Sequence, residues 1–189
     1  MSIIDKAIAA VTPPESAEDR AKARAKAMAA AEDGDWLSLI LRHHLDLEAA
    51  LAAVENATEE EERAIAFKAF GVLLTGHSIA EEGVIYPTLS AASETGHADM
   101  GYSEQSMVKM QMAALEKLDP LSMAFADKLE HIKGALLHHM YEEEGNWFLD
   151  LKEKTTAADQ EMLTERYTEE FERYMGSGEL DEIEDDDEV

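Results

Sequence analysis

One phrase occurs twice in this chain, as HSIAEEGVIYP at residues 77–87 and as HMYEEEGNWFL at residues 139–149. Alignment of the two copies pairs His77 with His139, Glu81 with Glu143, Glu82 with Glu144, Gly83 with Gly145 and Tyr86 with Phe148. Positions i and i+4 of an α-helix lie one above the other on the same face. Each copy therefore presents an imidazole and a carboxylate together, and two such pairs facing each other would form a cage for two metal ions.

The composition around these phrases indicates an all-α protein. The chain has 189 residues with 46% apolar content, which is enough for one sizeable core, and its length argues against two full domains. It contains only 10 glycines and 4 prolines, and its apolar residues recur at helical rather than alternating spacing. Amphipathic helices packed around a single core are therefore expected.

The charge and the cysteine count narrow the classes of partner and of metal site. The 42 acidic residues outnumber the 16 basic ones, and the net charge of −26 opposes binding to nucleic acid and to anionic membranes. Because the chain has no cysteine, a metal site must use nitrogen and oxygen ligands. The first residues do not form a signal peptide and no apolar run reaches the length of a membrane span, so we expect a cytoplasmic protein.

Caps and helix breakers predict four core helices between two extensions. We expect these helices from Asp35 to about Asn56, from the cap at Thr58 and Glu61 to Pro87, from the end of a loop over residues 93–101 to Leu118, and from Asp119 and Pro120 to about Lys154. The predicted N-terminal extension covers residues 1–34 and has a capping box at Thr12 and Glu15. A C-terminal helix from Asp159 to Met175 lies within residues 155–178, and residues 179–189 form an acidic tail that we predict to be disordered.

The apolar stripes of three core helices carry the candidate ligands. His44 shares its stripe with Ile40 and Leu47, whereas the neighbouring His43 lies off it. His77 and Glu81 continue the stripe of the second core helix, and His139 and Glu143 continue that of the fourth. The histidines at 131 and 138 are predicted to lie outside the site, as are Tyr86, Tyr141 and Trp147, which are interpreted as packing residues, and His97 is a less favoured ligand because it falls in the predicted loop.

Two buried glutamates at matching depth predict a bound cation. An ionised carboxylate in the core costs several kcal/mol or more unless it is paired or binds a metal ion. A mixed imidazole and carboxylate set suits iron or manganese best, and zinc can occupy the same ligands. The general plan is that of the four-helix di-iron proteins.

The phrases LRHHLDLEAAL, GHSIAEEGVIYP and LLHHMYEEEGNWF resemble the first, second and fourth helices of the hemerythrin-like, HHE cation-binding domain. The resemblance covers about Asp35 to Lys154. It implies an antiparallel up-down four-helix bundle around two iron ions joined by an oxo or hydroxo bridge. It also implies terminal ligands at His44, His77 and His139 and bridging ligands at Glu81 and Glu143.

The third helix departs from the family pattern. The family usually supplies a further histidine there, whereas this chain has Glu104 and Gln105, with Gln105 on the stripe of Val108 and Met112. An amide oxygen is a weaker donor than an imidazole. Gln105 binds a metal ion weakly, or Glu104 or water replaces it, or one coordination position stays open.

Three classes of function fit this sequence. In the first, the metal pair binds or reacts with dioxygen, peroxide or nitric oxide in sensing or stress defence, either as an enzyme or as a binding protein. In the second, the protein stores or donates iron. In the third, the metal only braces the bundle. The expected partner is a small diatomic or peroxide ligand, with no nucleic acid and no membrane, and a homo-oligomer is left open.

Overall fold

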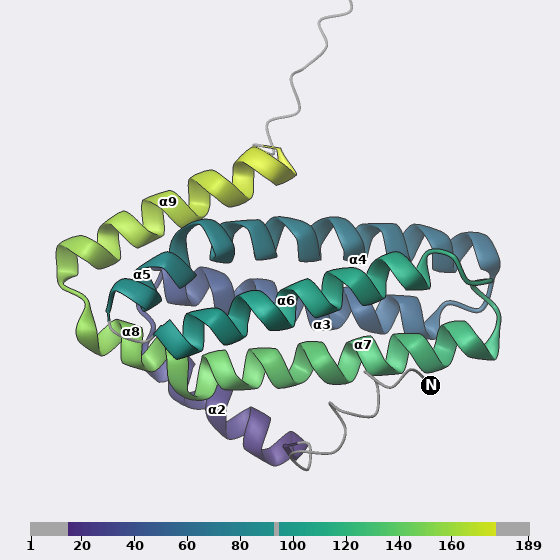
Figure 1. Cartoon of the computed structure of the whole chain (residues 1–189), viewed down its shortest axis with the longest axis horizontal. Coiled ribbons are helices and arrows are strands. Elements are labelled where there is room, and N and C mark those ends of the chain that lie inside the picture. The colour runs from purple at the N-terminus through teal and green to yellow at the C-terminus, as the bar shows by residue number, and fades with distance from the viewer. Residues whose placement is uncertain (1–14, 93–94, 177–189) are drawn as a thin grey trace, which may run out of the picture.

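Residues 15–92 and 95–176 are described by the computed structural model of the chain, which Figure 1 shows. Its helices are α2 (Ala17–Ala30), α3 (Trp36–Asn56), α4 (Glu60–Ala80), η1 (Glu81–Ile85), α5 (Tyr86–Ala91), α6 (Thr95–Leu115), α7 (Met123–Glu142), η2 (Glu143–Trp147), α8 (Phe148–Lys154) and α9 (Ala157–Met175), where η marks a π-helical turn. The described residues form no strand, and the predicted all-α class is confirmed.

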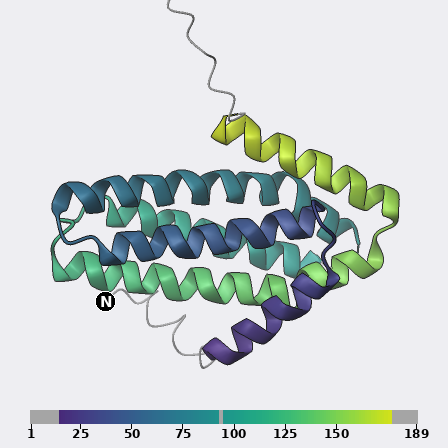
Figure 2. The same cartoon turned by 180° about the vertical axis from the view of Figure 1, so that it is seen from behind.

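Four of these helices, α3, α4, α6 and α7, lie side by side along the molecule (Figures 1 and 2). Helix α3 packs against α4 and α7, and α6 packs against α7. The shorter α5 and α8 lie at one end of this group. Helices α2 and α9 lie outside it on opposite sides, with α2 against η2 and α9 against α4 and η1.

The interior consists of two apolar clusters separated by a polar layer. The first cluster includes Trp36, Leu37, Ile40, Val84, Trp147 and Phe148. The second includes Leu47, Leu51, Phe70, Leu74, Leu136 and Met140. His44, His77 and Glu143 each fall in the sequence between a residue of one cluster and a residue of the other, whereas Glu81 is flanked by Ala80 and Val84 of the first cluster and His139 by Leu136 and Met140 of the second. Apolar side chains therefore cover the polar layer from both ends and limit the access of water to it.

Several predicted helix ends are confirmed. Helix α3 begins after Asp35, whose side chain accepts a hydrogen bond from the Ser38 amide, and it ends at Asn56. The helical run that contains α7, η2 and α8 ends at Lys154, as expected. Helix α9 ends at Met175 because Gly176 adopts a positive φ of 85°, which a side chain would disfavour.

Other predicted boundaries were wrong. Residues 95–101 belong to helix α6 rather than to a loop, and α6 ends at Leu115 rather than Leu118. Helix α7 is capped by Ser122, whose hydroxyl accepts from the Phe125 amide, and not by Asp119. No side-chain hydrogen bond caps α4, which begins at Glu60. The capping box predicted at Thr12 and the predicted tail lie outside the described residues, as do residues 93–94 of the predicted loop.

Candidate metal centre

Each copy of the repeated phrase contains a π-helical turn, which starts at Glu81 in the first copy and at the matching Glu143 in the second. The amide of Tyr86 donates to the carbonyl of Glu81, and the amide of Phe148 donates to the carbonyl of Glu143, which are both i to i−5 bonds. Such turns occur frequently at functional sites in helices. The sequence predicted that the helix ends or kinks at Pro87. The chain instead stays helical there, with Pro87 in the first turn of α5, and the change from α-helix to π-helix occurs earlier, at Glu81.

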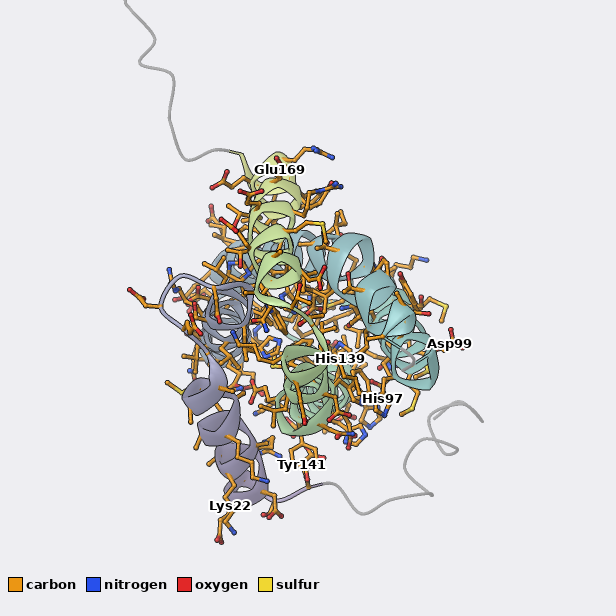
Figure 3. The ribbon with its side chains drawn as sticks, turned by 90° about the vertical axis from the view of Figure 1, so that its left-hand side faces the viewer. Lys22, His97, Asp99, His139, Tyr141 and Glu169 are labelled. Carbon is orange, nitrogen blue, oxygen red and sulfur yellow. The ribbon has the colours of Figure 1, made fainter. Side chains whose placement is uncertain are left out.

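The α-helical residues before each π turn bring the predicted ligands together. Two groups of buried side chains place one ligand atom each within 4.8 Å of the others. The first group contains His44, His77 and Glu81, and the second contains Glu81, His139 and Glu143. Glu81 belongs to both groups, which is the arrangement that two ions sharing a carboxylate require. His139 points into the space between the helices when the molecule is viewed along them (Figure 3).

The atoms that face this space fit a bound cation. His44 Nε2 lies 3.4 Å from Glu143 Oε2, and His77 Nε2 lies 3.2 Å from Glu81 Oε2. Nε2 of His44 and His77, Oε1 of Glu81 and Oε2 of Glu143 are buried without a hydrogen-bond partner within the described part of the chain. Buried polar atoms are nearly always paired, so these converging unpaired nitrogen and oxygen atoms indicate a binding site for a cation.

The ionisation of the metal-free side chains reflects the same crowding of charge. Burial and the nearby Glu143 carboxylate raise the pKa of Glu81 to about 7. Burial opposes protonation of His139, but the charge of Glu143 and the hydrogen bond to Glu104 outweigh it and raise the pKa of His139 to about 9. Burial and the positive charge of His44 hold the pKa of His77 well below its ordinary value. Without a metal ion, protons on Glu81 and His139 therefore provide part of the positive charge that a bound cation would provide.

The outward-facing Nδ1 atom of each histidine in the cluster has a hydrogen-bond partner. His44 Nδ1 lies 2.8 Å from Glu144 Oε1, and His139 Nδ1 lies 2.8 Å from Glu104 Oε2. His77 Nδ1 lies 3.2 Å from the hydroxyl of Tyr167 on α9. Such partners fix the ring orientation and the tautomer of histidine ligands. In all three residues they leave Nε2 directed at the cluster.

Tyr86 was predicted to be a packing residue, but its hydroxyl lies in the polar cluster. Its hydroxyl lies 3.0 Å from His139 Nε2 and donates to Glu143 Oε1 at 2.9 Å. The ring packs closely on α6 at Gly101, where a Cβ atom would lie 2.8 Å from the Tyr86 Cζ. Burial and the charges of Glu143 and Glu81 raise the pKa of Tyr86 well above its ordinary value, so the metal-free phenol keeps its proton.

The two third-helix candidates occupy different places. Gln105 Nε2 donates to Glu81 Oε2 at 2.6 Å and to the Tyr86 hydroxyl at 2.8 Å. Its Oε1 atom is buried without a hydrogen-bond partner in the described structure. Glu104 instead lies behind His139, on the side away from the cluster. The geometry makes Gln105 and Tyr86 the neighbours of the ligand group around His139 and makes Glu104 an outer partner.

The histidines predicted to lie outside the site do so. The ring of His43 stacks on Phe171 at a centroid distance of 3.9 Å, and its Nδ1 lies 2.8 Å from the Tyr167 hydroxyl. Burial, with the charge of His44, lowers the pKa of His43 to about 4. His138 pairs with Glu15 at 2.9 Å, and His131 is exposed.

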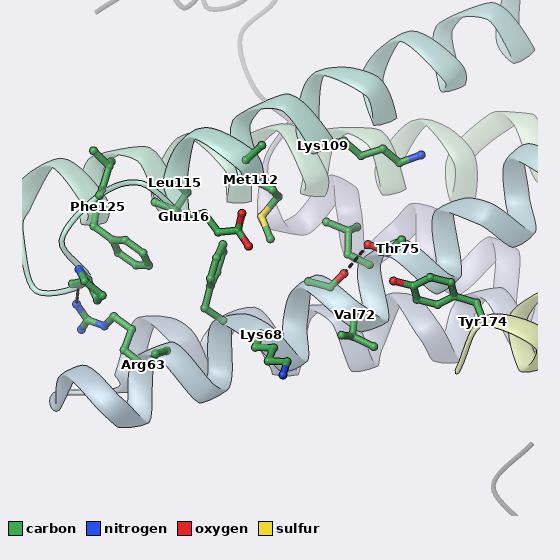
Figure 4. A pocket seen from close by; sticks show the side chains of 17 residues that line it. Arg63, Lys68, Val72, Thr75, Lys109, Met112, Leu115, Glu116, Phe125 and Tyr174 are labelled. Carbon is green, nitrogen blue, oxygen red and sulfur yellow. Dashed lines mark hydrogen bonds between the residues drawn. The ribbon is translucent and has the colours of Figure 1, made fainter. Parts of the chain in front are cut away.

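A separate groove of about 610 Å³ runs between α4 and α6 (Figure 4). Arg63 and Phe125 lie at one end of it and Tyr174 of α9 at the other. Its lining includes none of the predicted ligands, so it is distinct from the buried cluster. None of the described helices combines the length and the apolar character needed to cross a membrane.

Comparison with known proteins agrees with this geometry. The model of the hemerythrin HHE cation binding domain matches residues 36–151, which include every residue of the cluster. The chain belongs to this family. The cluster of this hemerythrin-like domain lies within the matched residues, and its histidine and glutamate set can hold metal ions.

Two individual proteins are similar to this hemerythrin-like chain. One is a hemerythrin HHE cation binding domain-containing protein from Mycobacterium kansasii, which is 26% identical in sequence to this chain. Its crystal structure superposes on this structure with a TM-score of 0.68, and the match covers 76% of this chain and 88% of the relative. The other is a DNA nickase from Nostoc sp., with 26% identity over 98 residues. That match covers 52% of this chain and 27% of the nickase.

Proposed function

We propose that this protein holds two iron or manganese ions and binds or reacts with a small oxidant, such as dioxygen, peroxide or nitric oxide. The observation that carries the proposal is the sharing of Glu81 between two groups of buried ligand atoms. In this proposal α3, α4, α6 and α7 are an antiparallel up-down bundle over residues 35–154. His44 and His77 hold one ion, His139 holds the other, and Glu81 and Glu143 bridge them.

The donor set supports iron or manganese as the metal. Imidazole and carboxylate ligands suit these ions, and the chain has no cysteine that would favour a soft metal. When bound, such a metal pair supplies exchangeable electrons and coordination positions for a small ligand. The apolar clusters on both sides of the polar layer limit the access of bulk water and strengthen the electrostatic interactions in it.

The residues around His139 differ from those around His44 and can manage a proton. The hydroxyl oxygen of Tyr86 lies 2.9 Å from Glu143 Oε1 and donates its proton to it, and it accepts a hydrogen bond from Gln105 Nε2. Tyr86 is therefore placed to give a proton to Glu143 or to take part in binding the metal. Gln105 also steadies the carboxylate of Glu81, which accepts from the same amide nitrogen.

The similarity to the nickase does not lead us to propose DNA nicking for this protein. The matching segment is 27% of the nickase, and the net charge of −26 opposes an approach to the phosphate backbone. Iron storage or donation uses the same ligands but requires metal that leaves readily. The rate of metal release to a chelator separates storage from oxidant chemistry.

The test is metal analysis combined with an oxidant reaction. Full-length protein reconstituted without oxygen with ferrous iron should contain close to two ions per chain. Its absorption spectrum should change when oxygen, peroxide or nitric oxide is added. A content below about one tenth of an ion per chain after reconstitution contradicts the proposed metal centre. Full occupancy without any spectral response to these ligands contradicts the oxidant function and favours a structural metal.

A further inference from the structure

We infer that helices α2 and α9 form the outer layer of one of the two metal positions, by orienting His44 and His77. Both helices lie outside the residues that the family model matches, 36–151. The inference rests on the proposed metal centre and adds a division of labour to it: the flanking helices support one position, and the helices between them support the other.

Helix α2 reaches His44 through Glu144. It packs on the second π turn, where a Cβ atom on Gly145 would lie 3.4 Å from Ala23 Cβ. This approach brings Arg24 to Glu144, and the guanidinium donates from Nε at 3.0 Å and from Nη2 at 2.8 Å to Oε1 of that carboxylate. The same Glu144 Oε1 lies 2.8 Å from His44 Nδ1, so the position of Arg24 sets the position of the carboxylate that orients the His44 ring.

Helix α9 reaches His77 directly. Tyr167 is fully buried, and its hydroxyl lies 3.2 Å from His77 Nδ1 and 2.8 Å from His43 Nδ1. When His77 uses Nε2 as a ligand atom, Nδ1 carries the hydrogen and donates it to the Tyr167 oxygen. The Tyr167 hydroxyl is then left to donate to His43 Nδ1. One hydroxyl thus fixes both the ring plane and the tautomer of His77.

The third histidine depends on neither flanking helix. The partner of His139 Nδ1 is Glu104, which belongs to α6 and lies within the matched residues. Loss of an outer partner commonly costs a metal site 10 to 100 times in affinity, as a rough guide. Disturbing α2 or α9 should therefore weaken the ion held by His44 and His77 and leave the ion held by His139 in place.

The test uses cobalt(II) binding to metal-free, full-length protein, followed by its visible absorption and by competition with a chelator. Tyr167→Phe removes one hydroxyl and keeps the ring, and Arg24→Gln removes the charge beside Glu144. Each variant should bind one of the two cobalt ions about 10 to 100 times more weakly. The visible absorption of that ion should change, and the absorption of the other ion should stay as in the parent. Arg24→Lys, which keeps the charge, should restore part of the affinity.

Matched controls separate this effect from general loss of structure. Tyr174→Phe changes another tyrosine of α9, and Arg20→Gln changes an arginine of α2 that pairs with Glu15. Both should bind two cobalt ions like the parent. The two test variants lie on different helices, so a folding defect in one, seen as lost helical circular dichroism, leaves the other to decide.

Double variants assign the weakened position. Tyr167→Phe should add nothing to the loss caused by His77→Ala, because both act on one ion. It should add its full effect to the loss caused by His139→Ala. The inference is overturned when Tyr167→Phe and Arg24→Gln keep both affinities, or when they weaken both ions equally. A parent protein that binds no cobalt refutes the metal centre itself, which is a separate outcome.

Discussion

Replacement of Glu81 by glutamine should stabilise the metal-free protein and abolish the stabilisation that metal ions provide. Glutamine has nearly the volume of glutamate, and its side-chain oxygen can accept the hydrogen bond that Gln105 now donates to Glu81 at 2.6 Å. The substitution removes the negative charge of a side chain that is 0% exposed and lies beside Glu143. Stability without metal and stability with metal should therefore change in opposite directions.

The magnitude for the metal-free protein follows from the pKa of Glu81, which burial and Glu143 raise from 4.5 to about 7. One pKa unit corresponds to about 1.4 kcal/mol, so the ionised side chain costs the folded state about 3 kcal/mol. Because the folded pKa lies above the unfolded one, the favourable contribution of Glu81 exists below pH 4.5 and is lost as the pH rises through about 7. Glutamine does not ionise, so the variant escapes this loss in mildly alkaline buffer.

The magnitude with metal follows from mass action. An ion that binds only the folded state adds about 2.7 kcal/mol when its concentration is about 100 times its Kd. For a chain of this size, 1 kcal/mol shifts the melting temperature by about 2–4 °C. The metal-free Glu81→Gln protein should melt about 6–12 °C above the metal-free parent. Metal should raise the parent by about 5–11 °C and the variant hardly at all.

The assay is thermal unfolding at mildly alkaline pH with and without manganese, read by circular dichroism. Glu82→Gln is the matched control, because Glu82 is the next residue on the same π turn and pairs with Lys109 outside the cluster. It should keep the metal-dependent rise. A Glu81→Gln protein that melts below the metal-free parent refutes the reasoning on buried charge. One that keeps the parent's response to metal shows that Glu81 is not a ligand.

Further predictions concern the other side of the cluster, the pH and the tail. Gln105→His should tighten metal retention and change azide binding, whereas Gln105→Ala should lose less metal than His77→Ala. Metal content and azide titration measure both effects. Affinity for cobalt should rise at least about tenfold per pH unit between pH 7 and about 9, because His139, with its pKa raised to about 9, and His44, with its pKa raised well above the ordinary value, must each lose a proton to bind; chelator competition at several pH values measures this. Gly101→Ala should disturb the site by displacing the Tyr86 ring, which lies 2.8 Å from the added methyl position, and lower metal content. Deletion of the chain after Gly178 should leave the metal content unchanged.

The sequence predicted the residues of the cluster because helical periodicity holds up to each π turn. His44, His77 and His139 lie on apolar stripes, and the i and i+4 glutamates share the face of their histidines. Beyond Glu81 the register changes. In a straight α-helix Tyr86 would lie about 180° around the axis from His77, so its place in the cluster was invisible to periodicity. The signal that could have revealed it is the pair of Glu-Glu-Gly phrases, which both form π turns.

The outer partners could not be predicted for a different reason. Arg24 and Tyr167 contact the cluster from segments far away in the sequence, and such contacts leave no periodic pattern. Helix α2 buries only Ala23 and Ala27, two small side chains that allow a close approach but form no apolar stripe that the sequence could reveal. The role of the flanking helices therefore depends on tertiary packing that local propensity does not encode.

The repeated phrase produces two halves that are similar in backbone and different in chemistry. At the position where the first copy has Tyr86, the second has Phe148, whose ring stands edge-on to Trp36 and stacks near His44. The Phe148 ring lies beside His44 and offers no oxygen to the cluster. The Tyr86 ring crosses to the other copy, where its hydroxyl lies beside His139 together with the amide of Gln105. Since imidazole is a stronger donor than a neutral amide, an ion held by His139 would have fewer strong ligands than one held by His44 and His77, and we predict that exogenous ligands bind there first.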